Sequence, residues 1–332
     1  MQLPLDSGFE SASAGTTGDA SGRARRRWLE LALDYRCNLR CIGCHACQDT
    51  GERLSGAEAG GYLRSARERG IDRLWLGGGE PTLRDDLLAI VRTARQMGFV
   101  EVALQTNGMR LAYPRYRDAL LAAGVTEVRF NVKSHRADVH DRLSGGVPCH
   151  ALAMEAIDRL AQLAGAPVRL VADVLLARGT AADLPLLVTD LARRGVKSIV
   201  LWLLSAADAN DDAVRAEVPR IGDLWAALAT ARENAGRAGV ELTSLHTPPC
   251  TLPPPLRGLF SPAADLGLLV VGPDARPFPL EDSPFEGGAY TKACWGCAAR
   301  PSCGGPRADY VAIHGDSEFV SLEAPVAAGA SS

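Results

Sequence analysis

Short apolar runs alternate with helical patterns from residue 28 to about residue 204. In the helical stretches, such as 84–97 and 151–164, apolar residues recur every three or four positions, and glycines often close them. The apolar runs between them predict strands at 29–33, 73–76, 100–104, 125–132, 168–176 and 198–204. Six such strand–helix units predict an α/β fold in which a parallel sheet with outer helices curves into a partial (β/α)6 barrel.

The pattern changes after residue 245. Segment 248–262 holds six prolines, and 266–271 with 275–278 reads as a hairpin around Gly272-Pro273-Asp274. A small cysteine-rich β-hairpin/helix module is therefore expected to follow the barrel. The expected divisions are a disordered tail at 1–27, the barrel at 28–245, the module at 246–320 and a flexible tail at 321–332.

Composition excludes several classes of protein. The 332 residues include 36 basic and 39 acidic side chains, with a net charge of −3, which counts against a nucleic-acid partner. There is no run of about 18 apolar residues, so no membrane partner is expected. Residues 1–27 lack the apolar core of a secretory signal, which favours a cytoplasmic location and metal or redox work for the nine cysteines.

Three of these cysteines directly follow the first predicted strand. Cys37, Cys41 and Cys44, at x3 and x2 spacing, can hold three irons of a [4Fe–4S] cluster and leave the fourth iron open. The loop after a barrel strand lies at the catalytic end of such folds. A closed cluster that also uses Cys47 is the alternative; otherwise Cys47 and His45 are expected near the lip of the site.

The Cx3Cx2C spacing resembles the signature of the radical SAM superfamily, and the resemblance extends over residues 28–245. It implies that Gly78, Gly79 and Glu80, in a GGEP segment, receive the amino group of S-adenosylmethionine (SAM). Asn107, in a TNG segment, matches a further family motif, and Asn131 lies where relatives often have a serine that contacts the cofactor.

One further stretch supports this resemblance, and two single positions depart from it. The stretch 140–145 resembles an HDxxxG segment that commonly follows in the family. Gly43 replaces a usual aromatic residue, and Lys133 replaces a usual aspartate, so contacts to adenine and to the cofactor are expected to differ.

The second cysteine group has the pattern C-x2-C-x5-C and resembles SPASM/Twitch modules, which bind auxiliary iron–sulfur clusters. The resemblance implies one auxiliary [4Fe–4S] cluster, with Cys250 as an upstream candidate for its fourth ligand. The candidate ligands are Cys250, Cys294, Cys297 and Cys303. Zinc is the alternative, because C-x2-C is a common zinc half-site. Cys149 has no partner in the sequence and is expected to be a buried structural thiol.

The resemblance implies reductive cleavage of SAM to a 5′-deoxyadenosyl radical, which abstracts a substrate hydrogen in a net oxidative modification. A ribosomally made peptide is slightly favoured as substrate over a small molecule such as an aminocyclitol or a nucleotide. Expected partners are an electron donor such as flavodoxin or ferredoxin, and a separate peptide-recognition protein. A non-catalytic iron–sulfur carrier or a zinc-stabilised scaffold is the alternative from another class. Lys133, His135, Asp173 and Trp202 are candidate pocket residues, and no general base is assigned.

Overall fold

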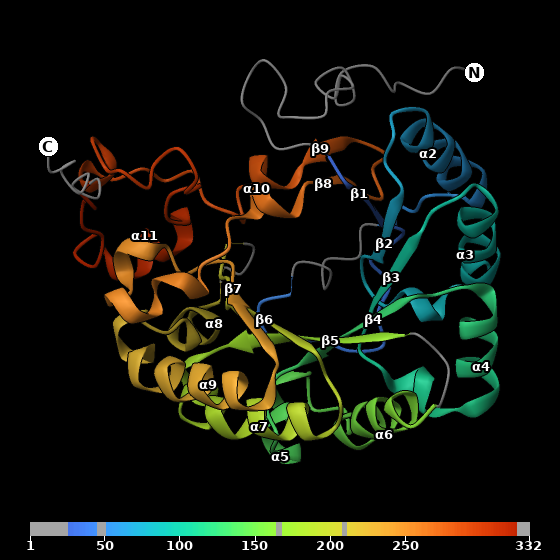
Figure 1. The fold of residues 1–332 in the computed structure, drawn as a ribbon, viewed down its shortest axis with the longest axis horizontal. Helices are drawn as coiled ribbons and strands as arrows, with labels where there is room; N and C mark the ends of the chain where they lie inside the picture. Colours follow the sequence, from blue (N-terminus) through green and yellow to red (C-terminus); the bar gives the residue numbers. More distant parts are fainter. Residues whose placement is uncertain (1–25, 45–50, 164–167, 208–210, 324–332) are drawn as a thin grey trace, which may run out of the picture.

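The computed structural model describes residues 26–44, 51–163, 168–207 and 211–323 (Figure 1). The expected tail before residue 26, the tail after residue 323, and the expectations for His45 and Cys47 lie outside the described residues.

The described chain forms one nine-stranded sheet with the order β7-β6-β5-β4-β3-β2-β1-β8-β9. Every neighbouring pair is parallel except β8 and β9. This confirms the α/β fold with an open, partial barrel, and the hairpin expected near residue 270 forms as β8 and β9. The strands are β1 (Trp28–Ala32), β2 (Arg73–Gly77), β3 (Glu101–Thr106), β4 (Glu127–Val132), β5 (Arg169–Leu176), β6 (Ser198–Leu203), β7 (Glu241–Ser244), β8 (Leu268–Val271) and β9 (Pro277–Pro279).

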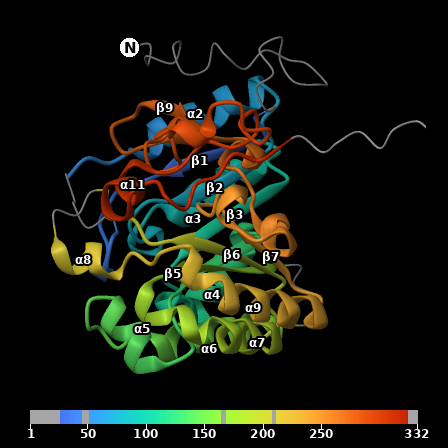
Figure 2. The ribbon, with the colours of Figure 1, turned by 90° about the vertical axis from the view of Figure 1, so that its left-hand side faces the viewer.

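The main helices lie outside the curved sheet, as Figures 1 and 2 show. The first of them begins at a capping box, where the side chains of Ser55 and Glu58 each accept a hydrogen bond from the other residue's backbone N–H. None of the helices among the described residues is long and apolar enough to cross a membrane. The helices are α2 (Gly56–Glu68), α3 (Leu87–Gln96), α4 (Pro114–Ala123), α5 (Ala137–Leu143), α6 (His150–Ala161), α7 (Leu184–Arg193), α8 (Asp212–Glu217), α9 (Trp225–Ala238), α10 (Ala263–Leu266) and α11 (Ala308–His314).

Strand alternation gives the sheet an outer face that packs on the helices and an inner face that we call the lumen. On β1, Leu29 and Leu31 are fully buried in the main core, so Glu30 between them points to the opposite face. The same alternation holds on the other strands of the barrel. The lumen is therefore lined by Glu30, Gly77, Gln105, Arg129, Asp173 and Trp202.

The C-terminal segment packs against both sides of the barrel. Strand β8 pairs in parallel with β1, so the hairpin extends the barrel sheet. At the other side, Arg307 donates hydrogen bonds to the carbonyls of Leu203 and Leu204, both at 2.7 Å, at the end of β6. Asp309 accepts from the N–H of Ala206 at 2.9 Å. These contacts hold the cysteine-bearing segment close to the C-terminal ends of the barrel strands.

Candidate functional site

The loop that carries Cys37, Cys41 and Cys44 follows β1 and lies at the C-terminal edge of the barrel. All three thiols are partly exposed, and none of the eight described cysteines forms a disulfide. The loop is anchored to the end of α5, because the N–H groups of Arg40 and Ile42 donate to the carbonyls of Ser144 and Leu143. Three reduced, accessible thiols on an anchored loop are a donor set that fits an iron–sulfur cluster with an open iron.

The GGE segment packs directly on the backbone that leads into this cysteine loop. The N–H of Gly79 donates to the carbonyl of Asp34, and the N–H of Glu80 donates to that of Arg36, both at 2.8 Å. A Cβ on Gly78 would come within 2.4 Å of the Asp34 oxygen, and one on Gly79 within 2.2 Å of the Arg36 oxygen. Gly78 also has φ of +110°. Only glycine permits this approach, which binds the two loops together.

Glu80 connects the GGE segment to the TNG segment. Its carboxylate is 2% exposed and accepts from the Thr106 hydroxyl at 2.8 Å and from the Asn107 N–H at 2.7 Å, in addition to two donors of Thr82. Burial is the main cause that raises the pKa of Glu80, against these hydrogen bonds. In turn, the Asn107 amide donates to the Asn38 side chain at 2.8 Å, within the cysteine loop. The three motifs predicted from the sequence therefore meet at one edge of the sheet.

Two departures from the family pattern have structural counterparts. Gly43 has φ of +64°, and a Cβ there would lie 2.5 Å from the Leu204 side chain and 2.6 Å from the Ser205 carbonyl. A side chain at this position would therefore collide with the end of β6. Lys133 is 2% exposed, and its ammonium donates to the Asn131 side chain at 2.7 Å. Asn131 thus holds a buried positive charge at the C-terminal end of β4.

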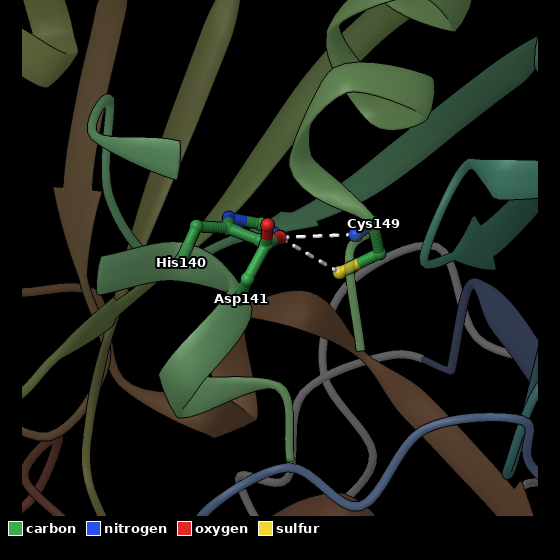
Figure 3. A group of neighbouring side chains, drawn as sticks. All are labelled: His140, Asp141 and Cys149. Carbon is green, nitrogen blue, oxygen red and sulfur yellow. Dashed lines mark hydrogen bonds between the residues drawn. The ribbon is translucent and has the colours of Figure 1, made fainter. Parts of the chain in front are cut away.

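The HDxxxG stretch at 140–145 joins the end of α5 to the start of α6 (Figure 3). The Asp141 carboxylate accepts from the N–H of Cys149 at 3.0 Å and from that of His150 at 2.8 Å, at the start of α6. Nδ1 of His140 accepts from the N–H of Lys133 at 3.3 Å. His140, Asp141 and Cys149 lie close enough together to suggest a metal site, but two backbone N–H groups already occupy the same carboxylate oxygen. We interpret the group as a helix cap, and Cys149 is the buried thiol that was expected.

The four C-terminal cysteines line one cavity. Ala293, Phe319 and Arg300 are among the other residues that line it. Burial raises the pKa of Cys250 to about 11, and the neighbouring thiols contribute to the same shift. The structure thus brings Cys250 to the other three cysteines, Cys294, Cys297 and Cys303.

The spacing of the thiols bears on the choice between zinc and a cluster. A tetrahedral zinc with Zn–S bonds of about 2.3 Å would hold its sulfurs about 3.8 Å apart. Among the described residues, no three cysteine sulfurs come within 4.8 Å of one another. A [4Fe–4S] cluster is a larger body and separates its thiolates further, so the spacing of the four thiols fits a cluster better than zinc.

Asp173 and Trp202, two of the predicted pocket residues, meet in the lumen. Arg129 binds both oxygens of Asp173, at 2.7 and 3.2 Å, and also contacts Glu127 at 2.9 Å. The Trp202 indole donates to Asp173 at 3.2 Å, and Gln105 donates to it at 3.1 Å. His135 has no such role, and its Nδ1 is buried with no hydrogen-bond partner among the described residues.

Three lumen residues were missed by the sequence reasoning. Glu30 lies with one carboxylate oxygen 3.1 Å from the position that a Cβ on Gly77 would occupy. His246 and Glu286 form a pair at 3.0 Å with exposures of 5% and 6%, and the His246 ring packs edge-on to Trp202. The pair lines a groove between the barrel and the C-terminal segment. A charged residue at the centre of an apolar strand was the available signal for Glu30, whereas no local pattern indicates the His246–Glu286 pair.

Comparison with known sequences agrees with this geometry. Residues 34–177 match the family model of the radical SAM superfamily. A probable GTP 3′,8-cyclase of Methanopyrus kandleri is 34% identical over 179 residues, which cover 52% of this chain and 55% of that protein. A protein of the same name from Methanothermobacter thermautotrophicus is 38% identical over 102 residues, covering 30% and 33%. The chain thus spans about half or less of the length of these curated relatives.

Solved structures share the fold over a longer part of the chain. Streptococcus suis SuiB bound to S-adenosylmethionine has a TM-score of 0.65 at 12% identity, covering 90% of this chain and 76% of SuiB. The protein anSMEcpe with bound AdoMet and a peptide has a TM-score of 0.56 at 13% identity, covering 89% and 93%. At these identities the likeness concerns the fold alone. Together with the cysteine, GGE and TNG loops, the family match leads to one conclusion: residues 34–177 of this chain resemble a radical SAM domain in sequence and in the arrangement of its loops.

Proposed function

We propose that this protein uses SAM and a [4Fe–4S] cluster on Cys37, Cys41 and Cys44 to remove a hydrogen atom from a small polar substrate in the lumen. The observation that carries the proposal is the convergence of the cysteine, GGE and TNG loops through Glu80 and through the bond between Asn107 and Asn38. If only the GGE segment or only the cysteines had a function, there would be no reason for hydrogen bonds to join all three loops.

When bound, SAM and the cluster together would supply one-electron cleavage of the SAM sulfonium, which provides a radical able to attack an unactivated C–H bond. The residues of this chain would bind SAM and orient it beside the cysteine loop. Gly78 and Gly79 keep the backbone open beside the cysteine loop, and Asn131 with Lys133 presents an amide and a positive charge at the end of β4. A buried ammonium at that position suits the carboxylate of an amino-acid cofactor.

For the substrate, the relatives support a small molecule over the peptide that the sequence slightly favoured. The curated relatives are named as cyclases of a nucleotide, and the match to the Methanopyrus kandleri protein covers 52% of this chain. A peptide is the second candidate, because SuiB, which shares the fold, has been solved with its precursor peptide SuiA. Net oxidation, as opposed to cyclisation or rearrangement, stays a prediction from the sequence.

We also propose that Cys250, Cys294, Cys297 and Cys303 hold one auxiliary [4Fe–4S] cluster. The shared cavity and the wide spacing of the thiols support this assignment. A flavodoxin or ferredoxin is the class of electron donor that the first cluster would need. The expected divisions of the chain near residues 28, 245 and 320 are retained as part of this proposal.

The test is SAM cleavage by anaerobically reconstituted protein with dithionite. Wild type should form 5′-deoxyadenosine, and iron analysis should give about eight irons per chain if both sites hold a cluster. Replacing Cys37, Cys41 and Cys44 by Ala should abolish cleavage and leave about four irons at the C-terminal site. Cys149→Ala is the matched control, because this thiol lies outside both sites, and it should retain both. Cleavage retained by the triple variant would refute the proposal.

A further inference from the structure

His246 and Glu286 form a buried pair at the border between the lumen and the C-terminal segment. Their side chains are 5% and 6% exposed, and Nε2 of His246 lies 3.0 Å from a carboxylate oxygen of Glu286. The His246 ring packs edge-on to Trp202, which lines the lumen. The pair also lines the groove that shares Cys303 with the cysteine cavity. A molecule in this groove would therefore lie beside both the lumen and the C-terminal cysteines.

The pair has unused hydrogen-bonding capacity at both ends. Nδ1 of His246 is enclosed and has no hydrogen-bond partner among the described residues. In the same part of the chain, His246 is the one partner of the Glu286 carboxylate, and it contacts a single oxygen. The buried carboxylates of Glu80 and Asp173, by contrast, accept four hydrogen bonds each. Because buried polar groups are normally hydrogen-bonded, the open oxygen of Glu286 points to a donor from outside the chain.

The open atoms of the pair accept hydrogen bonds. A carboxylate oxygen can only accept, so Nε2 of His246 carries the proton of the bond between them. Nδ1 is then a bare lone pair, and a second proton there would be an enclosed donor without a partner, which costs free energy. The pair thus presents the negative charge of Glu286 and no free donor. A hydroxyl or an amine can donate to it, whereas an anion without a proton, such as sulfate, would be repelled.

Arg300 is the group in the groove that would instead select an anion. The rings of Tyr290 and Trp295 pack on its guanidinium at 5.0 and 4.4 Å, and no carboxylate within the described ranges forms an ion pair with it. The side chain of Arg300 is only partly buried, so water can satisfy its donors. The more deeply buried Glu286 has no such access on most of its surface, which makes it the stronger determinant of what binds.

We propose that Glu286, held in place by His246, accepts a hydrogen bond from a hydroxyl or amine of the substrate in this groove. Glu286 is the group that touches the substrate, and His246 is a positioning residue that acts through it. This rests on the proposed function, since it names how the small polar substrate is recognised at the same site. If the pair only tied the two chain segments together, its loss would lower stability without changing any binding affinity.

The test is isothermal titration of the anaerobic holoenzyme with SAM present and no reductant. Its probes are streptamine, a ring with hydroxyls and two ammonium groups, scyllo-inositol, the same ring with hydroxyls alone, and inorganic sulfate. Both rings should bind, streptamine about tenfold more tightly because its hydrogen bond is charge-assisted, and both more tightly than sulfate. Glu286→Gln should weaken streptamine binding about tenfold, whereas Glu233→Gln, on the exposed face of α9, should leave it unchanged.

Variants of His246 separate positioning from a purely structural role. His246→Phe should also weaken streptamine binding, and His246→Gln, whose amide N–H can donate to Glu286, should restore most of it. The melting temperature and the absorption of the clusters report whether each variant is folded.

Each result decides the inference. It is overturned if neither ring binds at millimolar concentration, if sulfate binds more tightly than the rings, or if Glu286→Gln leaves the affinity for streptamine unchanged. It is also overturned if His246→Gln binds no better than His246→Phe. Loss of SAM binding or cleavage in wild type would count against the proposed function, whereas normal SAM cleavage without binding that depends on Glu286 would count against this inference alone.

Discussion

Replacing Glu30 by Gln is expected to stabilise the protein at pH 8 much more than at pH 5.5. Burial raises the pKa of Glu30 from 4.5 to about 7, and the charges of Glu286 and Asp173 add to this rise against that of Arg129. The native state therefore keeps its proton over a pH range in which the unfolded state has lost it. Stability then falls as pH rises through that range, and Gln, which does not ionise, avoids the loss.

The size of the effect follows from the shift. A difference of about 2.5 pKa units corresponds to about 3 kcal/mol at pH 8, where the loss is complete. At pH 5.5 only about 1.4 kcal/mol has been lost, so the benefit of the substitution should differ by about 2 kcal/mol between the two conditions. Water that enters the lumen screens part of this difference, which makes 2 kcal/mol an upper value.

Thermal unfolding of the anaerobic holoenzyme at both pH values is the assay. The melting temperature of Glu30→Gln should exceed that of wild type by several degrees at pH 8 and by clearly less at pH 5.5. Glu233→Gln, an exposed carboxylate on α9, controls for the change in net charge and should have no such pH dependence. An equal shift at both pH values would refute the reasoning, because the pKa of Glu30 would then be the same in the folded and unfolded states. A benefit that is smaller at pH 8 than at pH 5.5 would also refute it, because the pKa of Glu30 would then be lowered by folding.

Four further substitutions test the rest of the site. Cys250→Ala should alter the EPR signal of the C-terminal cluster and leave that of the first cluster unchanged; two unchanged signals would contradict Cys250 as a ligand. Asp141→Ala should lower the free energy of unfolding by about 1 to 2 kcal/mol in urea without loss of iron, because it removes a helix cap. Arg129→Met should cost about 3 to 5 kcal/mol by uncovering a buried carboxylate, whereas Arg169→Met, at 51% side-chain exposure, should cost about 1 kcal/mol or less. Gly79→Ala should weaken SAM binding in equilibrium titration, because its Cβ would meet the Arg36 oxygen at 2.2 Å; wild-type affinity would show that the loops do not need this contact.

Much of the fold was accessible from the sequence because its signals are local. Strand and helix periods and the capping box at Ser55 depend on neighbours within a few positions. The same holds for the x3 and x2 spacing of Cys37, Cys41 and Cys44, which sets how three thiols can share one cluster. The hairpin near residue 270 was predicted, but its parallel pairing with β1 was not, because pairing between strands distant in sequence leaves no local pattern.

The sequence by itself indicated the chemistry at the ends of the strands, because each motif there is a short run whose residues are close together in the chain. Only the tertiary structure decided the character of the lumen. Glu30, Arg129 and Asp173 come from β1, β4 and β5, and Glu286 comes from the C-terminal segment; they interact only because the sheet curves and its register aligns them. The physical reason is that charge acts through space, so the field in which a substrate binds is the sum of residues that the sequence holds far apart.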